Sequence, residues 1–227
     1  MPYPQPSRVL VTDFDGTITD HDFYELIYPA CVSSDTPNYW EQYFAGQITH
    51  FEAMRGFFAH ITCDEARLHE IACAMKPDPD LAEAVAQLRQ AGWDIVVASA
   101  GCLWYIKYLL DRAGVSLTVH ANPGFFEPGR GLVLELPTDS PFLSTADGID
   151  KTAVVQDALA RYDIVAFAGN GPPDLSPAKC VPANLRFARG WLAETLTKEG
   201  LGFRPYQRWA EIAACLTRYP GGFEPRN

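Results

Sequence analysis

The stretch Val9-Leu-Val-Thr-Asp13-Phe-Asp15-Gly-Thr17 decides the fold of this chain. An apolar run delivers two carboxylates, spaced two residues apart, where the run gives way to Gly16. Because alternate residues of an extended strand point the same way, Asp13 and Asp15 are expected to face one side together. Like charges that close repel, and a divalent cation with oxygen ligands, typically Mg²⁺, relieves the repulsion. One carboxylate then serves as nucleophile and the other as acid and base. The simpler alternative is a strand that merely ends in an Asp-Gly turn.

Length and charge narrow the function classes. A chain of 227 residues fits one domain with a sizeable insertion better than two equal domains. The formal net charge is -10, which argues against nucleic-acid and anionic-membrane surfaces. Any site for an anionic substrate must therefore be locally positive. No apolar run approaches the length of a membrane span, and no basic segment precedes an apolar one at the N-terminus, so we expect a cytoplasmic protein.

The six cysteines are scattered along the chain, with no C-x-x-C pair and no histidine cluster at zinc spacing. This pattern is typical of free, mostly buried thiols in a reducing compartment. We therefore expect no disulfide. The cysteines are Cys31, Cys63, Cys73, Cys102, Cys180 and Cys215.

A helical block follows the first strand, since no strand signal occurs between residues 18 and 76. Two capping boxes, Thr49 with Glu52 and Thr62 with Glu65, mark helix starts. We predict an all-helical cap domain over 20–76, inserted into a core formed by 1–19 and 77–227. The predicted helices cover 22–32, 39–44, 50–60 and 63–75.

Strands and helices alternate after the helical block, which predicts an α/β fold with a Rossmann-like, doubly wound parallel sheet. Asp78 is expected to N-cap a helix with Pro79 at its first position, ending at Gly92. A β-hairpin over 125–136, turning at 128–129, is expected to form a small flap. The remaining predicted strands are 94–99, 117–120, 163–168 and 184–188; the helices are 102–113, one from 151, 189–199 and 207–218. Residues 139–150 are expected to be irregular, and the tail from 220 loose.

Polar residues follow the ends of several predicted strands, where ligands of doubly wound sheets bind. Ser99-Ala100-Gly101 leads from a strand towards a helix, so its hydroxyl and backbone N–H groups are suited to phosphate. Taken alone, each of these residues has an ordinary explanation, such as a helix cap, a solvated lysine or a loop acid. Their order along the chain makes a common site the better hypothesis. The set is Asp13, Asp15, Ser99, Lys151, Asn170 and Asp174.

This ordered set resembles the haloacid dehalogenase superfamily of phosphatases, with its D-x-D-G-T motif at 13–17 and a variant of its G-D-x-x-x-D motif at 169–174. The helical insertion resembles the cap of the phosphoserine phosphatase branch. Phe187-Ala-Arg189, with Pro205-Tyr206 leading into Trp209, resembles the C-terminal segment of the 2-hydroxy-3-keto-5-methylthiopentenyl-1-phosphate phosphatases of methionine salvage.

The resemblance implies a Mg²⁺-dependent phosphatase with an aspartyl-phosphate intermediate. Asp13 would attack phosphorus, Asp15 would act as acid and then as base, and Lys151 would neutralise charge. Ser99, Ala100 and Gly101 would bind phosphate. The implied metal ligands are Asp13, the backbone carbonyl of Asp15, Asn170 and Asp174.

Two departures from the family pattern bear on function. Asn170 stands where the family carries Asp, so the metal site loses a negative charge and metal affinity is expected to fall. Ala100 stands where Gly is usual and narrows the phosphate loop slightly.

Substrate-facing candidates in the cap are Asp22, Tyr24 and Arg55. The resemblance to the phosphoserine phosphatase branch implies that Asp22 would meet a substrate amine and that Arg55, one residue out of step with that branch, would meet a carboxylate. A role as a solvated cap residue is the alternative for each. Trp104 recurs at helical spacing with its aromatic neighbours, which favours packing, although it could also line the pocket.

These inferences lead to a hydrolase of a small phosphorylated metabolite, monomeric or homodimeric, with the methylthiopentenyl phosphate as one substrate. Phosphoserine or another phospho-alcohol such as phosphocholine is the alternative substrate. From a different class, Asn170 could mark a catalytically silent protein that only binds a phosphorylated metabolite.

Overall fold

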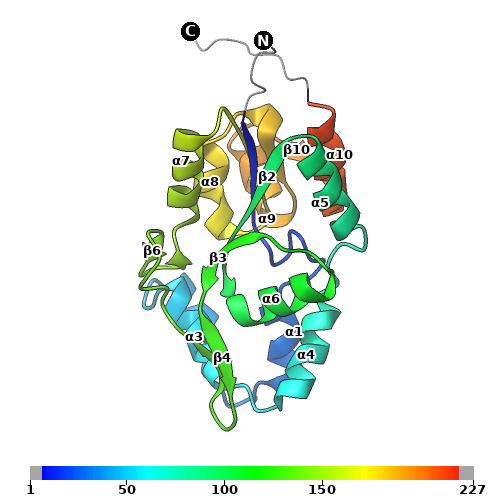
Figure 1. The fold of residues 1–227 in the computed structure, drawn as a ribbon. Coiled ribbons are helices and arrows are strands. Elements are labelled where there is room, and N and C mark those ends of the chain that lie inside the picture. The colour runs from blue at the N-terminus through cyan, green and yellow to red at the C-terminus, as the bar shows by residue number, and fades with distance from the viewer. Residues whose placement is uncertain (1–6, 220–227) are drawn as a thin grey trace, which may run out of the picture.

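The computed structural model describes residues 7–219, and its centre is a six-stranded sheet in the order β10-β9-β8-β1-β2-β3 (Figure 1). All five neighbouring pairs run parallel, with β1 between β2 and β8. This confirms the predicted Rossmann-like α/β fold. The strands are β1 (Arg8–Thr12), β2 (Trp93–Cys102), β3 (Thr118–Asn122), β8 (Ile164–Gly169), β9 (Arg186–Ala188) and β10 (Arg204–Pro205). Strand β10 was not predicted.

Helices cover both faces of the sheet because its central strands are apolar on both sides. In β1, Val9 and Val11 pack into one buried cluster while Leu10 packs into the other. Helices α7 (Lys151–Arg161), α8 (Leu175–Lys179) and α9 (Gly190–Lys198) cover the first face. The second is covered by α5 (Leu81–Gln90), α6 (Leu103–Arg112) and α10 (Trp209–Thr217). Short 3₁₀ turns occupy Pro172–Asp174 and Ala183–Leu185.

Four helices lie between β1 and α5, at the lower end of the molecule in Figure 1. The capping box at the start of α3 is confirmed: Thr49 Oγ1 accepts from the Glu52 N–H at 3.1 Å, and the Thr49 N–H donates to Glu52 Oε2 at 2.8 Å. The cap expected at Thr62 is wrong, because Asp64 accepts from the N–H of Arg67 and begins the helix there. The helices are α1 (Phe23–Cys31), α2 (Tyr39–Phe44), α3 (His50–Ala59) and α4 (Glu65–Ala74). Their division from the core as a separate domain stays a prediction.

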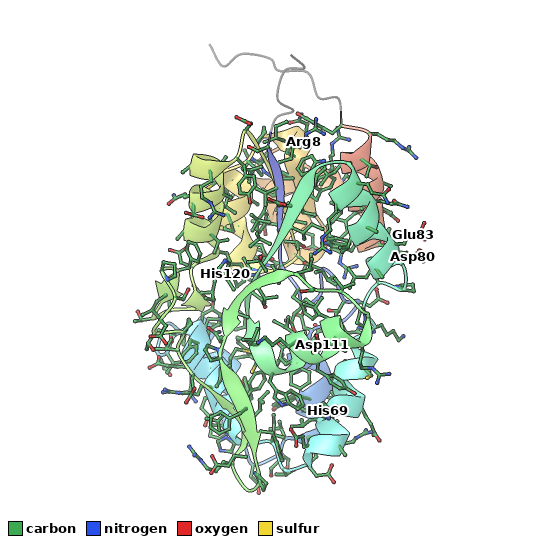
Figure 2. The ribbon with its side chains drawn as sticks, viewed as in Figure 1. Arg8, His69, Asp80, Glu83, Asp111 and His120 are labelled. Carbon is green, nitrogen blue, oxygen red and sulfur yellow. A yellow bond between two sulfur atoms is a disulfide. The ribbon has the colours of Figure 1, made fainter. Side chains whose placement is uncertain are left out.

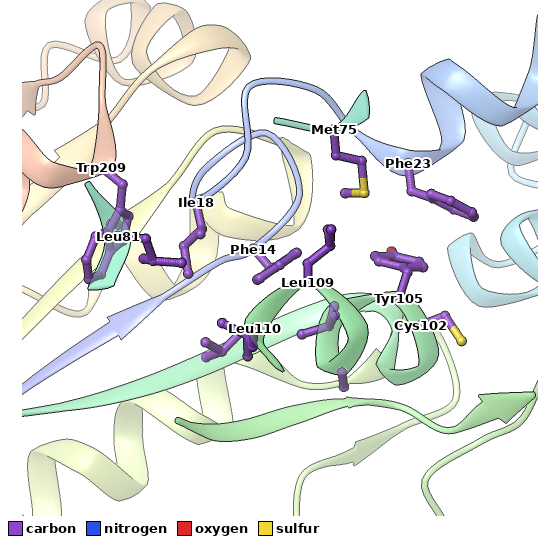
Figure 3. Packing of buried hydrophobic residues seen from close by; sticks show 14 of the residues in the cluster. Phe14, Ile18, Phe23, Met75, Leu81, Cys102, Tyr105, Leu109, Leu110 and Trp209 are labelled. Carbon is purple, nitrogen blue, oxygen red and sulfur yellow. The ribbon is translucent and has the colours of Figure 1, made fainter. Parts of the chain in front are cut away.

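One apolar core continues from the sheet into this helical group. In Figure 3, four buried side chains lie one after another in space, from the segment that follows β1 to helix α1: Phe14, Leu109, Tyr105 and Phe23. The rings of Phe23 and Tyr105 stack at 4.4 Å between centroids. The segment that follows β1 is therefore held from both sides, which positions the polar residues within it.

The predicted hairpin is formed by β4 (Gly124–Glu127) and β5 (Gly131–Leu134). Strand β5 packs against helix α3, and a methyl group on Gly131 would lie 2.4 Å from the carbonyl oxygen of Phe58. A second, shorter hairpin, β6 (Leu143–Ser144) with β7 (Gly148–Ile149), forms in the segment that was expected to be irregular.

Helix α5 starts later than the sequence predicts. Its N-cap is Asp80, and the carboxylate of Asp78 accepts hydrogen bonds from the N–H of Ala210 at 2.9 Å and from the side chain of Arg208 at 2.6 Å. The expected helix start at Asp78 is therefore two residues early. The Asp78 carboxylate still accepts from the N–H of Asp80 at 2.9 Å, as a cap would, but it shares this contact with Arg208 and Ala210, which are distant in sequence.

The cysteines also differ from the expectation of free thiols. Cys31 and Cys63 form a disulfide between the end of α1 and the segment before α4, with their Cα atoms 5.4 Å apart. An antiparallel bridge between Val32 and Ile61 brings the two segments together. The other four cysteines are free. The tail expected to be loose from 220 lies outside the described residues.

No helix within residues 7–219 has both the length and the apolar character needed to cross a membrane.

Candidate active site

A cavity of about 380 Å³ opens at the carboxyl end of β1 and is lined by both the core and the cap helices. Most of the residues singled out in the sequence come together here. The lining residues are Asp13, Asp15, Asp22, Tyr24, Trp40, Tyr43, Phe44, His50, Met54, Ser99, Ala100, Gly101, Tyr105, Lys151, Asn170, Gly171, Pro172, Pro173 and Asp174.

The charged centre of the cavity is Lys151, the first residue of α7. Its Nζ lies 2.7 Å from Asp13 Oδ1 and 2.7 Å from Asp174 Oδ1, and all three side chains are buried. Burial opposes the ammonium charge, but the two carboxylates outweigh it and raise the pKa of Lys151 above its ordinary value. The lysine is therefore a fixed cation that orients Asp13.

Asp174 has no free oxygen in this arrangement. Its Oδ1 accepts from Lys151, and its Oδ2 accepts from the N–H groups of Asn170 and Gly171, each at 2.9 Å. Asp174 thus closes the 170–174 loop and holds Lys151 in place, and its expected role as a metal ligand stays a prediction.

Asp15 lies beyond the end of β1, not within the strand as the two-residue spacing suggests. Its Oδ1 accepts from the N–H of Phe23 at 3.1 Å and its Oδ2 from the hydroxyl of Tyr105 at 3.0 Å. The turn between Asp15 and the cap depends on Gly16, whose φ is +61°, and a methyl group there would meet Asn170 Nδ2 at 2.2 Å. Burial raises the pKa of Asp15 to about 6, against the effect of these hydrogen bonds.

The segment 99–101 is part of the strand rather than a strand-to-helix turn, because β2 continues to Cys102. The N–H of Gly101 donates to Ser99 Oγ at 3.0 Å, so this N–H is already used. The carbonyl of Ala100 accepts from Asn122 Nδ2 at 2.7 Å, which anchors the segment to β3. The hydroxyl of Ser99 donates no hydrogen bond among the described residues, so its hydrogen is available to a phosphate oxygen.

Oxygen donors suited to Mg²⁺ are present near Asp13. Asp13 Oδ2 has only the hydroxyl of Thr17 nearby, at 3.5 Å, and the Asp15 carbonyl accepts no hydrogen bond among the described residues. Asn170 Oδ1 accepts from Thr17 at 3.0 Å. Within residues 7–219, no three His, Cys, Asp or Glu side chains gather as a metal cluster. The donors fit Mg²⁺ in kind, since this ion takes a few protein oxygens and keeps several waters.

The cap candidates differ in position. Asp22 and Tyr24, at the start of α1, line the cavity. Arg55 is not brought there: it is exposed, its guanidinium lies 5.7 Å from the ring centre of Phe51, and it lines a separate hollow beside the β4–β5 hairpin. Trp104, in α6, does not line the cavity either: its ring stacks on that of His69, in α4 and labelled in Figure 2, with the ring centres 4.6 Å apart.

Two residues, Arg189 and Trp209, hold the backbone around Asp13, although the sequence predicted no role for either in the site. Arg189 donates to the carbonyl oxygens of Gly16 at 2.6 Å, of Gln207 at 2.7 Å and of Thr19. Trp209 Nε1 donates to Thr12 Oγ1 at 3.1 Å, next to the backbone of Asp13. No local sequence signal marks these contacts, because all the partners except Gln207 lie between 170 and 197 residues away.

The sequence and the fold of the chain are both similar to those of known hydrolases. The pattern of the haloacid dehalogenase-like hydrolases matches residues 10–179. In fold, the chain is similar to a HAD family hydrolase from Salmonella enterica subsp. enterica serovar Typhi, with a TM-score of 0.69 and 17% identity over 96% of this chain and 74% of the other.

Two phosphoserine phosphatase structures are also similar. The enzyme from T. onnurineus aligns with a TM-score of 0.63 and 16% identity, over 95% of this chain and 98% of the other. A substrate-bound phosphoserine phosphatase aligns with a TM-score of 0.64 and 15% identity, over 90% and 95%. No curated protein matches the chain in sequence.

Proposed function

Because the chain belongs to the haloacid dehalogenase-like hydrolase family, we propose that it hydrolyses a small phosphomonoester in two steps through a phosphorylated Asp13. The observation that carries the proposal is the buried Lys151 ammonium, 2.7 Å from both Asp13 and Asp174 at the wall of the cavity. Burial and the charge of Asp174 raise the pKa of Asp13, and the Lys151 ammonium opposes this effect while it holds the carboxyl group in the orientation that a nucleophile requires. The phosphoserine phosphatases of similar fold support the same reaction class.

In the first step, an Asp13 carboxylate oxygen attacks phosphorus, and the bond from phosphorus to the alcohol oxygen breaks. Asp15 in its protonated form gives its proton to the leaving oxygen. Its pKa of about 6 leaves a usable fraction protonated near neutral pH, because burial disfavours the charged form. Tyr105 and the N–H of Phe23 hold the carboxyl group in place.

In the second step, Asp15, now a carboxylate, takes a proton from a water molecule. The water oxygen bonds to phosphorus, the bond to the Asp13 oxygen breaks, and inorganic phosphate leaves. Both steps spread negative charge over the phosphoryl oxygens, where Lys151 and the hydroxyl of Ser99 supply fixed positive charge and a hydrogen-bond donor.

Mg²⁺, held by the Asp13 carboxylate, the Asp15 backbone carbonyl and the Asn170 amide oxygen, would neutralise further charge on the phosphoryl group. The metal requirement is part of the proposal. The other finer expectations also stay predictions: a methylthiopentenyl phosphate or phosphoserine as substrate, a cytoplasmic location, and a monomer or homodimer.

Phosphate release from a panel of phosphomonoesters, with Mg²⁺ and with EDTA, tests the proposal. We expect metal-dependent turnover in the native chain and at least a 1,000-fold loss in Asp13→Asn, which keeps the side-chain shape but removes the nucleophile. The exposed Asp20→Asn is the matched control and should behave as the native chain. Turnover by Asp13→Asn at the native rate would refute the proposed nucleophile.

A second candidate function follows from Asn170, which places an amide where the family carries a carboxylate. A protein that binds a phosphorylated metabolite without turnover would show saturable binding but no phosphate release. If phosphate release appears only in Asn170→Asp, the amide at residue 170 is the reason why the native chain does not turn the ester over.

A further inference from the structure

Four aromatic residues from helices α1 and α2 line the cavity, and we call them the aromatic wall: Tyr24, Trp40, Tyr43 and Phe44. The ring centres of Tyr24 and Trp40 lie 4.9 Å apart at an interplanar angle of 86°, and those of Trp40 and Tyr43 lie 5.7 Å apart at 69°. In each pair the edge of one ring packs against the face of its neighbour, and all four residues line the cavity. The negative face of an aromatic ring attracts a cation, most strongly in Trp and Tyr.

One carboxylate oxygen of Asp22 has no partner among the described residues, and it lies in the same cavity beside Gly16 and Asn170. Asp22 lines the same cavity and precedes α1, whose first turn carries Tyr24. Within residues 7–219, no donor reaches the buried Oδ1 of Asp22, and the side chain forms no ion pair. Burial, followed by the charges of Asp15 and Glu25, raises the pKa of Asp22 to about 7, so a positive group on a ligand beside it would favour its charged form.

No cation on the protein serves that role. Lys151 is the only Lys or Arg among the described residues that line the cavity, and it already pairs with Asp13 and Asp174. Burial, followed by the nearby charge of Lys151, lowers the pKa of His50 to about 4, so this residue is neutral at physiological pH. A ligand carboxylate at the cap side would therefore meet Asp22 and find no partner, since Arg55 lines a different hollow.

Three kinds of substrate can be compared by the group that the esterified alcohol would place among these contacts: a thioether, a carboxylate or a methylated ammonium group. A neutral thioether would pack on the rings but leave Asp22 unpaired. The carboxylate of a phosphoamino acid would be repelled by Asp22. A methylated ammonium group satisfies both features, since its charge pairs with Asp22 and its methyl groups pack on ring faces without needing further hydrogen-bond acceptors.

We propose that the aromatic wall and Asp22 bind a methylated ammonium group, so that the substrate is the phosphomonoester of a quaternary-ammonium alcohol that carries no carboxylate. This inference rests on the proposed phosphomonoesterase activity and names the substrate class of the same site.

The sharpest test compares phosphocholine with 3,3-dimethylbutyl phosphate, which has the same shape but a carbon in place of the charged nitrogen. We expect kcat/KM to be at least 10-fold higher for phosphocholine, and higher again than for phosphoserine. Equal kcat/KM for the charged and neutral compounds, or a preference for phosphoserine, would overturn the inference.

Two variants separate recognition from folding. In Asp22→Asn and in Trp40→Leu, we expect the ratio of the two kcat/KM values to fall towards one, while a purely structural defect would lower both values and leave their ratio unchanged. Matched controls are Asp20→Asn, an exposed acid, and Tyr28→Leu, an aromatic residue of α1 outside the cavity. Both should keep the native ratio.

The two proposals fail in different ways. Hydrolysis of 3,3-dimethylbutyl phosphate without a preference for phosphocholine would refute the substrate class and leave the phosphatase standing. If no ester is hydrolysed, the phosphatase proposal fails, and calorimetric binding of the same two compounds still decides the ammonium site: equal or absent binding overturns it.

Discussion

Replacing Lys151 by methionine removes the cation that two buried carboxylates share, with little change in side-chain volume. The side chains of Lys151, Asp13 and Asp174 are 4%, 8% and 1% exposed, so water cannot substitute for the lost charge. Breaking a buried ion pair by removing one partner costs about 3–5 kcal/mol of the free energy of unfolding. For a chain of this size, that corresponds to a fall in Tm of roughly 6–20 °C. Phosphate release should be abolished.

The same variant should acquire a characteristic pH dependence. In the native chain, burial and the charge of Asp174 raise the pKa of Asp13 against the lowering effect of Lys151. Without Lys151 this opposing effect is lost, so the pKa of Asp13 should rise further and the folded state should hold a proton that the unfolded state releases above its ordinary pKa. The stability deficit should therefore be largest near pH 8 and shrink as the pH falls towards 5. Adding Asp174→Asn to Lys151→Met should recover part of the deficit, because one of the two unpaired charges is gone.

Urea unfolding of the variants at pH 5 and pH 8, in EDTA, measures both effects. Lys179→Met is the matched control, since Lys179 pairs with Glu199 at the surface and should cost less than about 1 kcal/mol. A loss of less than about 1 kcal/mol in the free energy of unfolding of Lys151→Met at pH 8 would refute the reasoning, because removing one partner of a buried ion pair should destabilise the folded state by more than this. So would a deficit that does not change with pH.

Three further predictions concern the groups around the nucleophile. In Tyr105→Phe, Asp15 loses a hydrogen bond that favours its charged form, so its pKa should rise above about 6 and the alkaline limb of the kcat/KM profile should move to higher pH; an unmoved limb would contradict this. In Asn170→Asp, an added carboxylate should lower the Mg²⁺ concentration for half-maximal activity roughly 3- to 10-fold, and an unchanged value would mean that residue 170 does not help to hold the metal. In Arg189→Met, the loss of three hydrogen bonds to backbone carbonyls should lower the free energy of unfolding by about 2–4 kcal/mol in urea, whereas the exposed Arg218→Met should change it little; equal effects would refute the anchoring role.

Much of the fold could be predicted because its signals are local. The buried strands are continuous apolar runs, and the capping box at Thr49 needs only the residues up to Glu52. The order Asp13, Ser99, Lys151 and Asp174 also located the site, because parallel strands bring their carboxyl ends to one edge.

The errors share a physical cause, which is competition from distant partners. Asp78 has the right local sequence for a helix cap, but Arg208 and Ala210 engage its carboxylate from α10. The pairing of Cys31 with Cys63 depends on the bridge between Val32 and Ile61, which no spacing rule reveals.

The sequence by itself determined the order of the main strands and helices and the groups that we propose to react, since both follow from periodicity and from side-chain chemistry. Only the tertiary structure decided which oxygens are free: it engages both oxygens of Asp174 and leaves one oxygen of Asp22 unpaired in the cavity that the aromatic wall lines. It also turned Arg55 away from the cavity. Hydrogen-bond and ring partners are set by packing between segments far apart in the chain, and no local pattern contains that information.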